Sequence, residues 1–80
     1  MTVHIMAFGI AKEIFGSASV VMEVRDGCSV QTLKQDLQGK YPGLAQLSSF
    51  LIAVNNQYAT GEQQLAPEDE IAVIPPVSGG

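Results

Sequence analysis

The residue types with the clearest chemical use stand at the end of the sequence, in Pro75-Pro76-Val77-Ser78-Gly79-Gly80. Paired prolines exclude helix and hold the chain extended, because their rings fix φ. Two glycines remove every side chain next to the final carboxyl group, so such a tail can enter a channel too narrow for a residue with a Cβ atom. We therefore divide the chain into a folded domain at residues 1–75 and a flexible tail at residues 76–80.

The chemistry that suits this tail is activation of its carboxyl group. A terminal carboxyl group has a pKa of roughly 3.5, so at neutral pH it is an anionic oxygen nucleophile. Attack on the α-phosphorus of ATP gives an acyl-adenylate, which a sulfur or nitrogen nucleophile then opens. We expect Gly80 to be the reacting residue and Gly79 to give access to it. The alternative is an uninformative, frayed end that happens to be glycine.

Composition limits the class of protein to one small domain of 80 residues with a net charge of −4. Nucleic-acid binding needs basic patches, which four cations do not provide. The single cysteine, Cys28, excludes an internal disulfide and fits a reducing compartment. No signal peptide or transmembrane span is recognised. We expect a cytoplasmic protein that contacts neither nucleic acid nor membrane and docks on a partner with a basic surface.

Apolar alternation and turn residues predict five strands, at residues 3–8, 19–25, 50–54, 57–60 and 71–74. The main helix is expected to begin after Ser29, a good N-cap, and to end before Pro42-Gly43. A short extra helix at residues 10–15 is expected to stop at Gly16. The order strand, strand, helix and three strands indicates an α+β fold. It resembles the β-grasp, or ubiquitin-like, fold, in which the first and last strands are parallel neighbours in the middle of a mixed sheet.

One helix covers only one face of such a sheet. Ile71 and Val73 are expected to face the helix, beside the alternate residues of the first strand. Ala72 and Ile74 then face outward, next to Met6 and Phe8. The prediction is an open apolar patch at the root of the tail, used to dock a partner and aim the tail. The alternatives are that loops cover this patch, or that it is exposed without a partner.

The chain resembles the small, sulfur-carrying subunit of molybdopterin synthase over essentially its whole length. The tail is the specific part of the resemblance, and four other stretches support it: Val3 to Phe8, Ala11 to Gly16, Ala53-Val54-Asn55 and Asp69-Glu70-Ile71-Ala72. The resemblance implies that a ubiquitin-activating-type enzyme uses ATP to adenylate Gly80, and that a sulfur donor converts the adenylate to a thiocarboxylate. The tail would then enter the large subunit and give sulfur to cyclic pyranopterin monophosphate, within a heterotetramer.

The same resemblance places catalytic lysines and the pterin pocket in the large subunit, so this chain is expected to bind no cofactor and no metal. Phe8 and Ile74 match positions that contact both partners, and Lys12 stands where the family often has arginine, which forms bidentate pairs that lysine does not. Ser78 replaces a frequent threonine and Ile74 an aromatic residue, changes expected to affect docking strength only. The expected partner-binding residues are Met6, Phe8, Lys12, Ile74, Pro75, Pro76, Val77 and Ser78.

Other reactive or aromatic side chains have plainer interpretations. Cys28 precedes the helix N-cap, where a thiol can become reactive, but we favour a small, buried and inert side chain. His4 has no metal-ligand partner at suitable spacing and is expected at the surface. Tyr41 and Tyr58 are expected at the edge of the core. The acidic residues of the loop are expected to form a solvated rim: Glu62, Glu68, Asp69 and Glu70.

Three other functions stay open. A thiamine-pathway or similar thiocarboxylate carrier shares the tail chemistry, although such chains typically lack the short helix at residues 10–15. A ubiquitin-like modifier would use the same adenylate to join Gly80 to a lysine of a target protein. A purely structural binding module would not depend on Gly79-Gly80 at all.

Overall fold

The structure is a computed structural model and describes residues 1–47 and 50–75. Its elements, in chain order, are β1 (Thr2–Ala7), α1 (Ile10–Phe15), β2 (Ser19–Glu23), α2 (Val30–Lys40), α3 (Pro42–Ala45), β3 (Leu51–Val54), β4 (Gln57–Tyr58) and β5 (Glu70–Ile74). The strands form one sheet in the order β2-β1-β5-β3-β4, with β1 and β5 parallel at its centre. This confirms the predicted α+β, β-grasp arrangement. Strand ends differ from the prediction by one or two residues.

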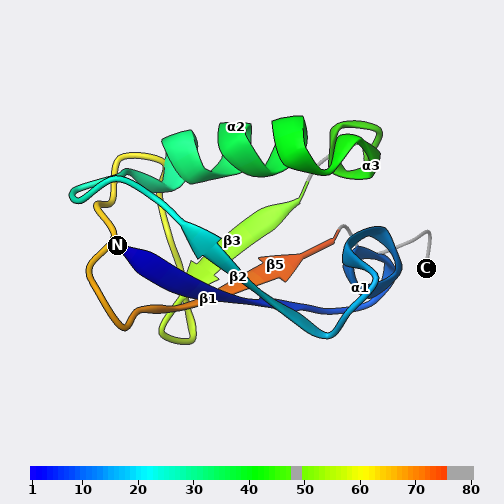
Figure 1. Cartoon of the computed structure of the whole chain (residues 1–80), viewed down its shortest axis with the longest axis horizontal. Helices are drawn as coiled ribbons and strands as arrows, with labels where there is room; N and C mark the ends of the chain where they lie inside the picture. The colour runs from blue at the N-terminus through cyan, green and yellow to red at the C-terminus, as the bar shows by residue number, and fades with distance from the viewer. Residues whose placement is uncertain (48–49, 76–80) are drawn as a thin grey trace.

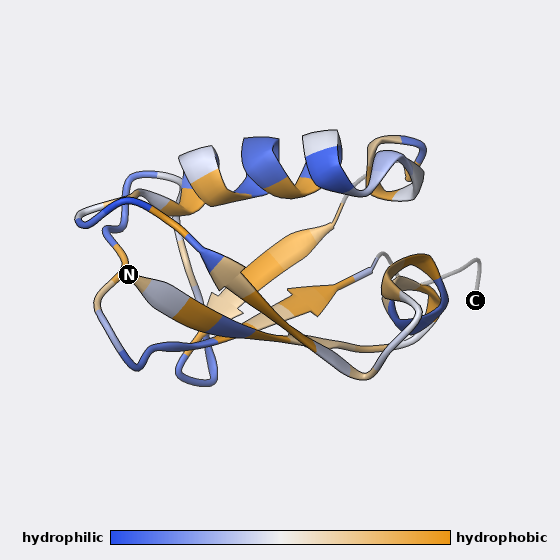
Figure 2. Ribbon diagram, viewed as in Figure 1, coloured by the Kyte–Doolittle hydropathy of each residue, from blue (hydrophilic) through white to orange (hydrophobic). Residues whose placement is uncertain are grey.

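Helix α2 lies across one face of the sheet (Figure 1), and its apolar stripe faces the strands (Figure 2). Val30, Leu33 and Leu37 are fully buried from the helix side. From the sheet side, the alternate residues of the central strands meet them, as predicted: Val3, Ile5, Ala7, Ile71 and Val73. Burial of a whole aliphatic side chain stabilises a fold by about 1.5–3 kcal/mol, so this layer holds the sheet to the helix.

The ends of α2 follow its sequence signals. The hydroxyl oxygen of Ser29 accepts from the backbone N–H of Thr32 at 3.2 Å, which confirms the predicted N-cap. Pro42-Gly43 ends α2 but does not end helical structure, since Pro42 is the first residue of α3. Proline suits that position because its missing N–H has no helical partner there. No helix was predicted after Pro42-Gly43, so α3 is an addition to the expected fold.

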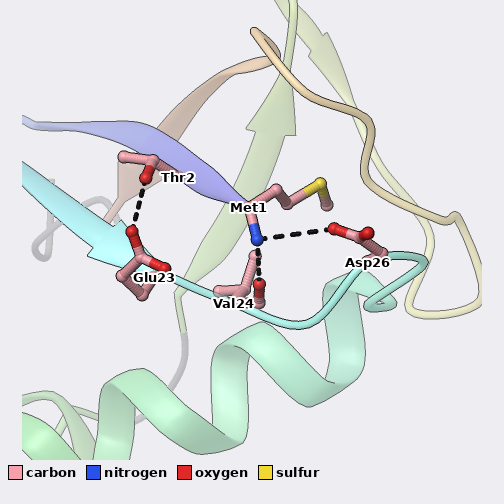
Figure 3. A network of polar contacts seen from close by, with 5 residues as sticks. All are labelled: Met1, Thr2, Glu23, Val24 and Asp26. Carbon is pink, nitrogen blue, oxygen red and sulfur yellow. Dashed lines mark hydrogen bonds and ion pairs between the residues drawn. The ribbon is translucent and has the colours of Figure 1, made fainter.

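The start of β1 is fastened to the end of β2 by polar contacts (Figure 3). The N-terminal ammonium of Met1 donates to the Val24 carbonyl oxygen at 2.6 Å and lies 3.4 Å from Asp26. The Thr2 hydroxyl donates to Glu23 at 2.6 Å. Asp26 is 91% exposed, so its ion pair is expected to add little. The backbone pairing itself keeps β1 and β2 in register.

The turn between β3 and β4 is anchored to the start of β5. Asn55 and Asn56 have φ values of 52° and 69°, which confirms the predicted tight turn. The Asn55 side chain donates to Asp69 and accepts from the backbone N–H of Glu70, both at 3.0 Å. Asp69 also accepts from the backbone N–H of Ala66 at 2.8 Å. Asp69 was predicted as part of a solvated rim, but it orders the loop that leads into β5.

Substitution of Asn55 by alanine is expected to lower the free energy of unfolding by about 2 kcal/mol. The change removes two side-chain hydrogen bonds, worth roughly 1 kcal/mol each at most here, and places alanine at positive φ. Asn56→Ala is the matched control, since it has the same backbone constraint without the links to residues 69 and 70. Urea unfolding measures both variants, and an equal loss in the two would contradict an anchoring role for Asn55.

Candidate functional site

The outer face of the sheet, opposite α2, has an apolar area built from alternate strand residues. Met6 on β1 lies next to Ala72 on β5, and Ala72 lies next to Ala53 on β3. Met6 and Ala72 are half-buried, whereas Phe8, directly after β1, is 49% exposed. The predicted outward orientation of Met6, Phe8, Ala72 and Ile74 is confirmed. The structure also places Ala53 and Tyr58 in the same area.

This area is hollowed to a volume of about 300 Å³ and is lined by Met6, Phe8, Ala53, Asn56, Tyr58, Ala72 and Ile74. We call these seven residues the outer hollow. Its two alanines are cross-strand neighbours and are the smallest of the seven. Larger side chains from β1, β4 and β5 surround them. A shallow apolar depression bounded by exposed aromatic rings is the shape into which a partner protein places an apolar side chain.

Three members of the outer hollow were missed or misplaced by sequence reasoning: Ala53, Asn56 and Tyr58. Tyr58 was expected at the core edge but is 70% exposed, because β4 is a two-residue edge strand with α2 on the opposite face. Tyr41 does lie at the core edge, with its ring centroid 4.5 Å from that of Phe15. Ala53 was predicted only as part of the strand at residues 50–54, without a place on the outer face. The outward position of Ala72 was predicted, but the sequence does not indicate that Ala53 pairs with Ala72 and so lies on the same face.

The strand that leads to the tail ends beside the outer hollow. β5 runs toward α1 (Figure 1), and both Ile74 and Pro75 are half-buried. Lys12 is exposed on α1. Pro76, Val77, Ser78, Gly79 and Gly80 lie outside the described residues. The structure therefore brings together Met6, Phe8 and Ile74 at the root of the tail, while the residues predicted to react lie outside the described part of the chain.

Cys28 is buried, with 8% of its surface exposed, directly before the N-cap of α2. Burial, with a smaller contribution from Asp36, raises the pKa of its thiol, and Arg25 lowers it only in part. The raised pKa means that folding favours the neutral thiol, so the contribution of Cys28 to stability falls as the pH rises through the thiol range. A neutral, buried thiol is a poor nucleophile, which fits the inert interpretation.

Cys28→Ser is accordingly expected to leave sulfur loading of the tail unchanged within about twofold. Iodoacetamide at pH 8 is expected to modify Cys28 much faster in urea-unfolded chain than in folded chain, since only the exposed thiol ionises freely. Intact mass reports both the loading and the alkylation. Loss of loading in Cys28→Ser, with an unchanged melting temperature, would instead show that the Cys28 thiol takes part in loading.

The outer face also carries polar residues, among them His4, Glu68 and Glu70, which line a second depression. His4 is exposed, as predicted, with Glu70 beside it on β5. Within residues 1–47 and 50–75, no group of three or more histidine, cysteine, aspartate or glutamate residues is placed to hold a metal ion. None of the helices in this part of the chain has the length and apolar character that crossing a membrane requires.

Comparison with known proteins agrees with this geometry. The ThiS family model matches residues 5–80. The molybdopterin synthase sulfur carrier subunit of Homo sapiens is 38% identical over 82 residues, which cover 98% of this chain and 93% of the human protein. SAMP1, a small archaeal modifier protein of Haloferax volcanii, superposes with a TM-score of 0.85 at 26% identity over 100% of both chains.

A further solved relative comes from Helicobacter pylori 26695, in a complex of subunits 1 and 2 of the molybdopterin-converting factor. It superposes with a TM-score of 0.70 at 26% identity, again over 100% of both chains. The family model and the human relative each extend over nearly the whole sequence. The chain belongs to the ThiS family.

Proposed function

We propose that this protein is the sulfur carrier subunit of a molybdopterin synthase. The observation that supports this most strongly is the position of the outer hollow beside the end of β5. This strand ends at Ile74, directly before the stretch that ends in Gly79-Gly80. A docking surface at that place lets binding energy fix the position of the tail before reaction. The human sulfur carrier subunit and the Helicobacter pylori complex of the molybdopterin-converting factor agree with the proposal.

The proposed reaction takes place at the carboxyl group of Gly80. An adenylating enzyme uses ATP to form the acyl-adenylate and releases pyrophosphate. A sulfur donor then displaces AMP, which leaves a thiocarboxylate on Gly80. Attack of the thiocarboxylate sulfur on cyclic pyranopterin monophosphate gives a thioester between Gly80 and the pterin. Water then cleaves the acyl–sulfur bond, which leaves the sulfur on the pterin and restores the carboxylate of Gly80. In this proposal ATP is bound by the adenylating enzyme, and this chain itself binds no cofactor.

Docking on the large subunit is assigned to the outer hollow and to Lys12. Met6, Phe8 and Ile74 supply apolar contact area, and Lys12 supplies a positive charge on α1, exposed at the surface. Pro75, Pro76, Val77 and Ser78 are proposed to line the entrance of the tail into the partner. The adenylating enzyme is proposed to use the same surface, because it must reach the same carboxyl group. We place these steps in the cytoplasm.

A second candidate is a ubiquitin-like modifier, favoured by the superposition on SAMP1. It shares the adenylate but ends in an amide bond between Gly80 and a lysine of another protein. The two candidates differ in the fate of the acyl group, which is hydrolysed in sulfur transfer and retained in conjugation. Helix α1, which carriers of the thiamine pathway typically lack, favours molybdopterin synthesis among the sulfur carriers.

Reconstitution tests the proposal directly. The chain is prepared as the Gly80 thiocarboxylate by intein cleavage and mixed with purified large subunit and cyclic pyranopterin monophosphate. Molybdopterin is expected to form in proportion to the thiocarboxylate consumed. Loss of the thiocarboxylate without molybdopterin would reject this function. In cells, a ladder of lysine conjugates that contain the C-terminal peptide would establish the modifier instead.

A further inference from the structure

Gly9 lies against Pro75, the last residue described at the root of the tail. A Cβ atom built on Gly9 would stand 3.3 Å from Cγ of Pro75, inside the usual carbon–carbon contact distance of about 3.5–4.0 Å. Gly9 has φ 55° and ψ −132°, a backbone conformation that side chains strongly disfavour. The ring of Pro75 therefore occupies space that a side chain at position 9 would need.

Both residues of this contact belong to well-fixed backbone. On one side, Ile74 pairs with Leu51 in the sheet, and the ring of Pro75 fixes its own φ and keeps Ile74 extended. On the other side, the carbonyl oxygen of Gly9 accepts from the backbone N–H of Lys12 at 3.1 Å, in the first turn of α1. The contact thus joins the end of β5 to the start of α1.

We propose that Gly9 is a positioning residue for the tail. Because Gly9 has no side chain, the Pro75 ring can pack against it, and this contact fixes the direction in which the chain leaves the folded domain. Phe8, which lines the outer hollow, directly precedes Gly9. One short loop therefore contributes both to the docking surface and to the direction of the chain after Pro75. This inference rests on the proposed function, because it assigns Gly9 an effect on delivery of Gly80 and not on docking.

The chain offers two controls for this proposal. Gly16 lies at the other end of α1 and also has positive φ, 75°, but a Cβ atom built there meets nothing within 4 Å. Gly16→Ala places alanine in the left-handed αL region, whereas Gly9→Ala places it at φ 55° and ψ −132°, which is more strained, and only Gly9→Ala displaces Pro75. Gly16→Ala therefore controls for positive φ beside α1, and the Pro75→Ala background controls for the additional strain at Gly9.

The test measures single-turnover sulfur transfer from Gly80 thiocarboxylate forms of the variants to the large subunit and its pterin substrate. Gly9→Ala is expected to slow transfer about tenfold, since a small misplacement of a reacting group has effects of that size. Its dissociation constant for the large subunit is expected to stay within twofold of the unsubstituted chain. Gly16→Ala is expected to match the unsubstituted chain in both quantities.

Removal of the ring provides a second arm. In the Pro75→Ala background, Gly9→Ala is expected to have no additional effect on the transfer rate, because Cγ of Pro75 is gone. Equal slowing by Gly9→Ala and Gly16→Ala, an undiminished effect of Gly9→Ala beside Pro75→Ala, or weaker binding as the cause of slow transfer would each overturn the inference. Failure of the unsubstituted chain to transfer sulfur would instead reject the proposed function.

Discussion

Deletion of Gly80 is expected to abolish sulfur loading and transfer, with a loss of at least about 100-fold in each rate. The shortened chain still ends in a glycine carboxylate, but that group is withdrawn by one residue, about 3.3–3.6 Å. A displacement of 1 Å at a reacting centre already costs up to about 100-fold in rate. The effect therefore arises from position, since the chemical nature of the terminal group is unchanged.

Two measurements separate this loss from unfolding or failed docking. The melting temperature is expected to be unchanged, because the buried core consists of residues between Val3 and Val73. Binding to the large subunit is expected to persist, since the outer hollow is intact. Appending one glycine after Gly80 gives the complementary variant, in which the carboxylate is displaced in the opposite direction. Full activity of both variants would contradict the claim that the length of the tail sets the position of the reacting carboxylate.

Phe8→Asp is expected to weaken binding to the large subunit by at least about 100-fold, or roughly 3 kcal/mol. Phe8 is half exposed in the free chain and lines the outer hollow. Docking would bury the introduced carboxylate without a partner, and apolar anchors of this kind dominate interface energies. Isothermal titration calorimetry or surface plasmon resonance with the purified large subunit measures the change.

Val21→Asp is the control for Phe8→Asp. Val21 is an equally apolar residue, 57% exposed on the edge strand β2, and it does not line the outer hollow. The same carboxylate at that position is expected to change the dissociation constant by less than about threefold. Near-equal weakening by the two substitutions would show that docking does not centre on the outer hollow.

Sequence reasoning predicted the fold well where one local signal was sufficient. Ser29 caps α2, Gly16 ends α1, and Asn55-Asn56 forms the turn after β3, each as its residue type indicates. The alternation in β1 and β5 predicted correctly which residues face α2. These positions depend on neighbours within a few residues, where propensity and periodicity are informative.

The features that sequence reasoning missed depend on contacts between distant parts of the chain. The outer hollow needs Ala53 beside Ala72, a pairing set by the register of β3 on β5. The role of Asp69 needs Asn55, and the close approach of Gly9 needs Pro75. No local pattern indicates any of these pairs. Tyr58 was misplaced for a related reason, since its exposure follows from the position of β4 at the sheet edge.

The proposed function depends most on a thiocarboxylate at Gly80. The direct test is the mass of the C-terminal peptide, measured on protein purified from its own cells. Replacement of one oxygen by sulfur adds about 16 Da, close to the gain from oxidation of a methionine or cysteine. The peptide after Ala72 contains neither residue, so a gain of that size on it identifies the thiocarboxylate. We predict that gain, and its absence after deletion of Gly80. An unmodified peptide in cells with an active sulfur-donor system, or one joined to lysine, would contradict the account.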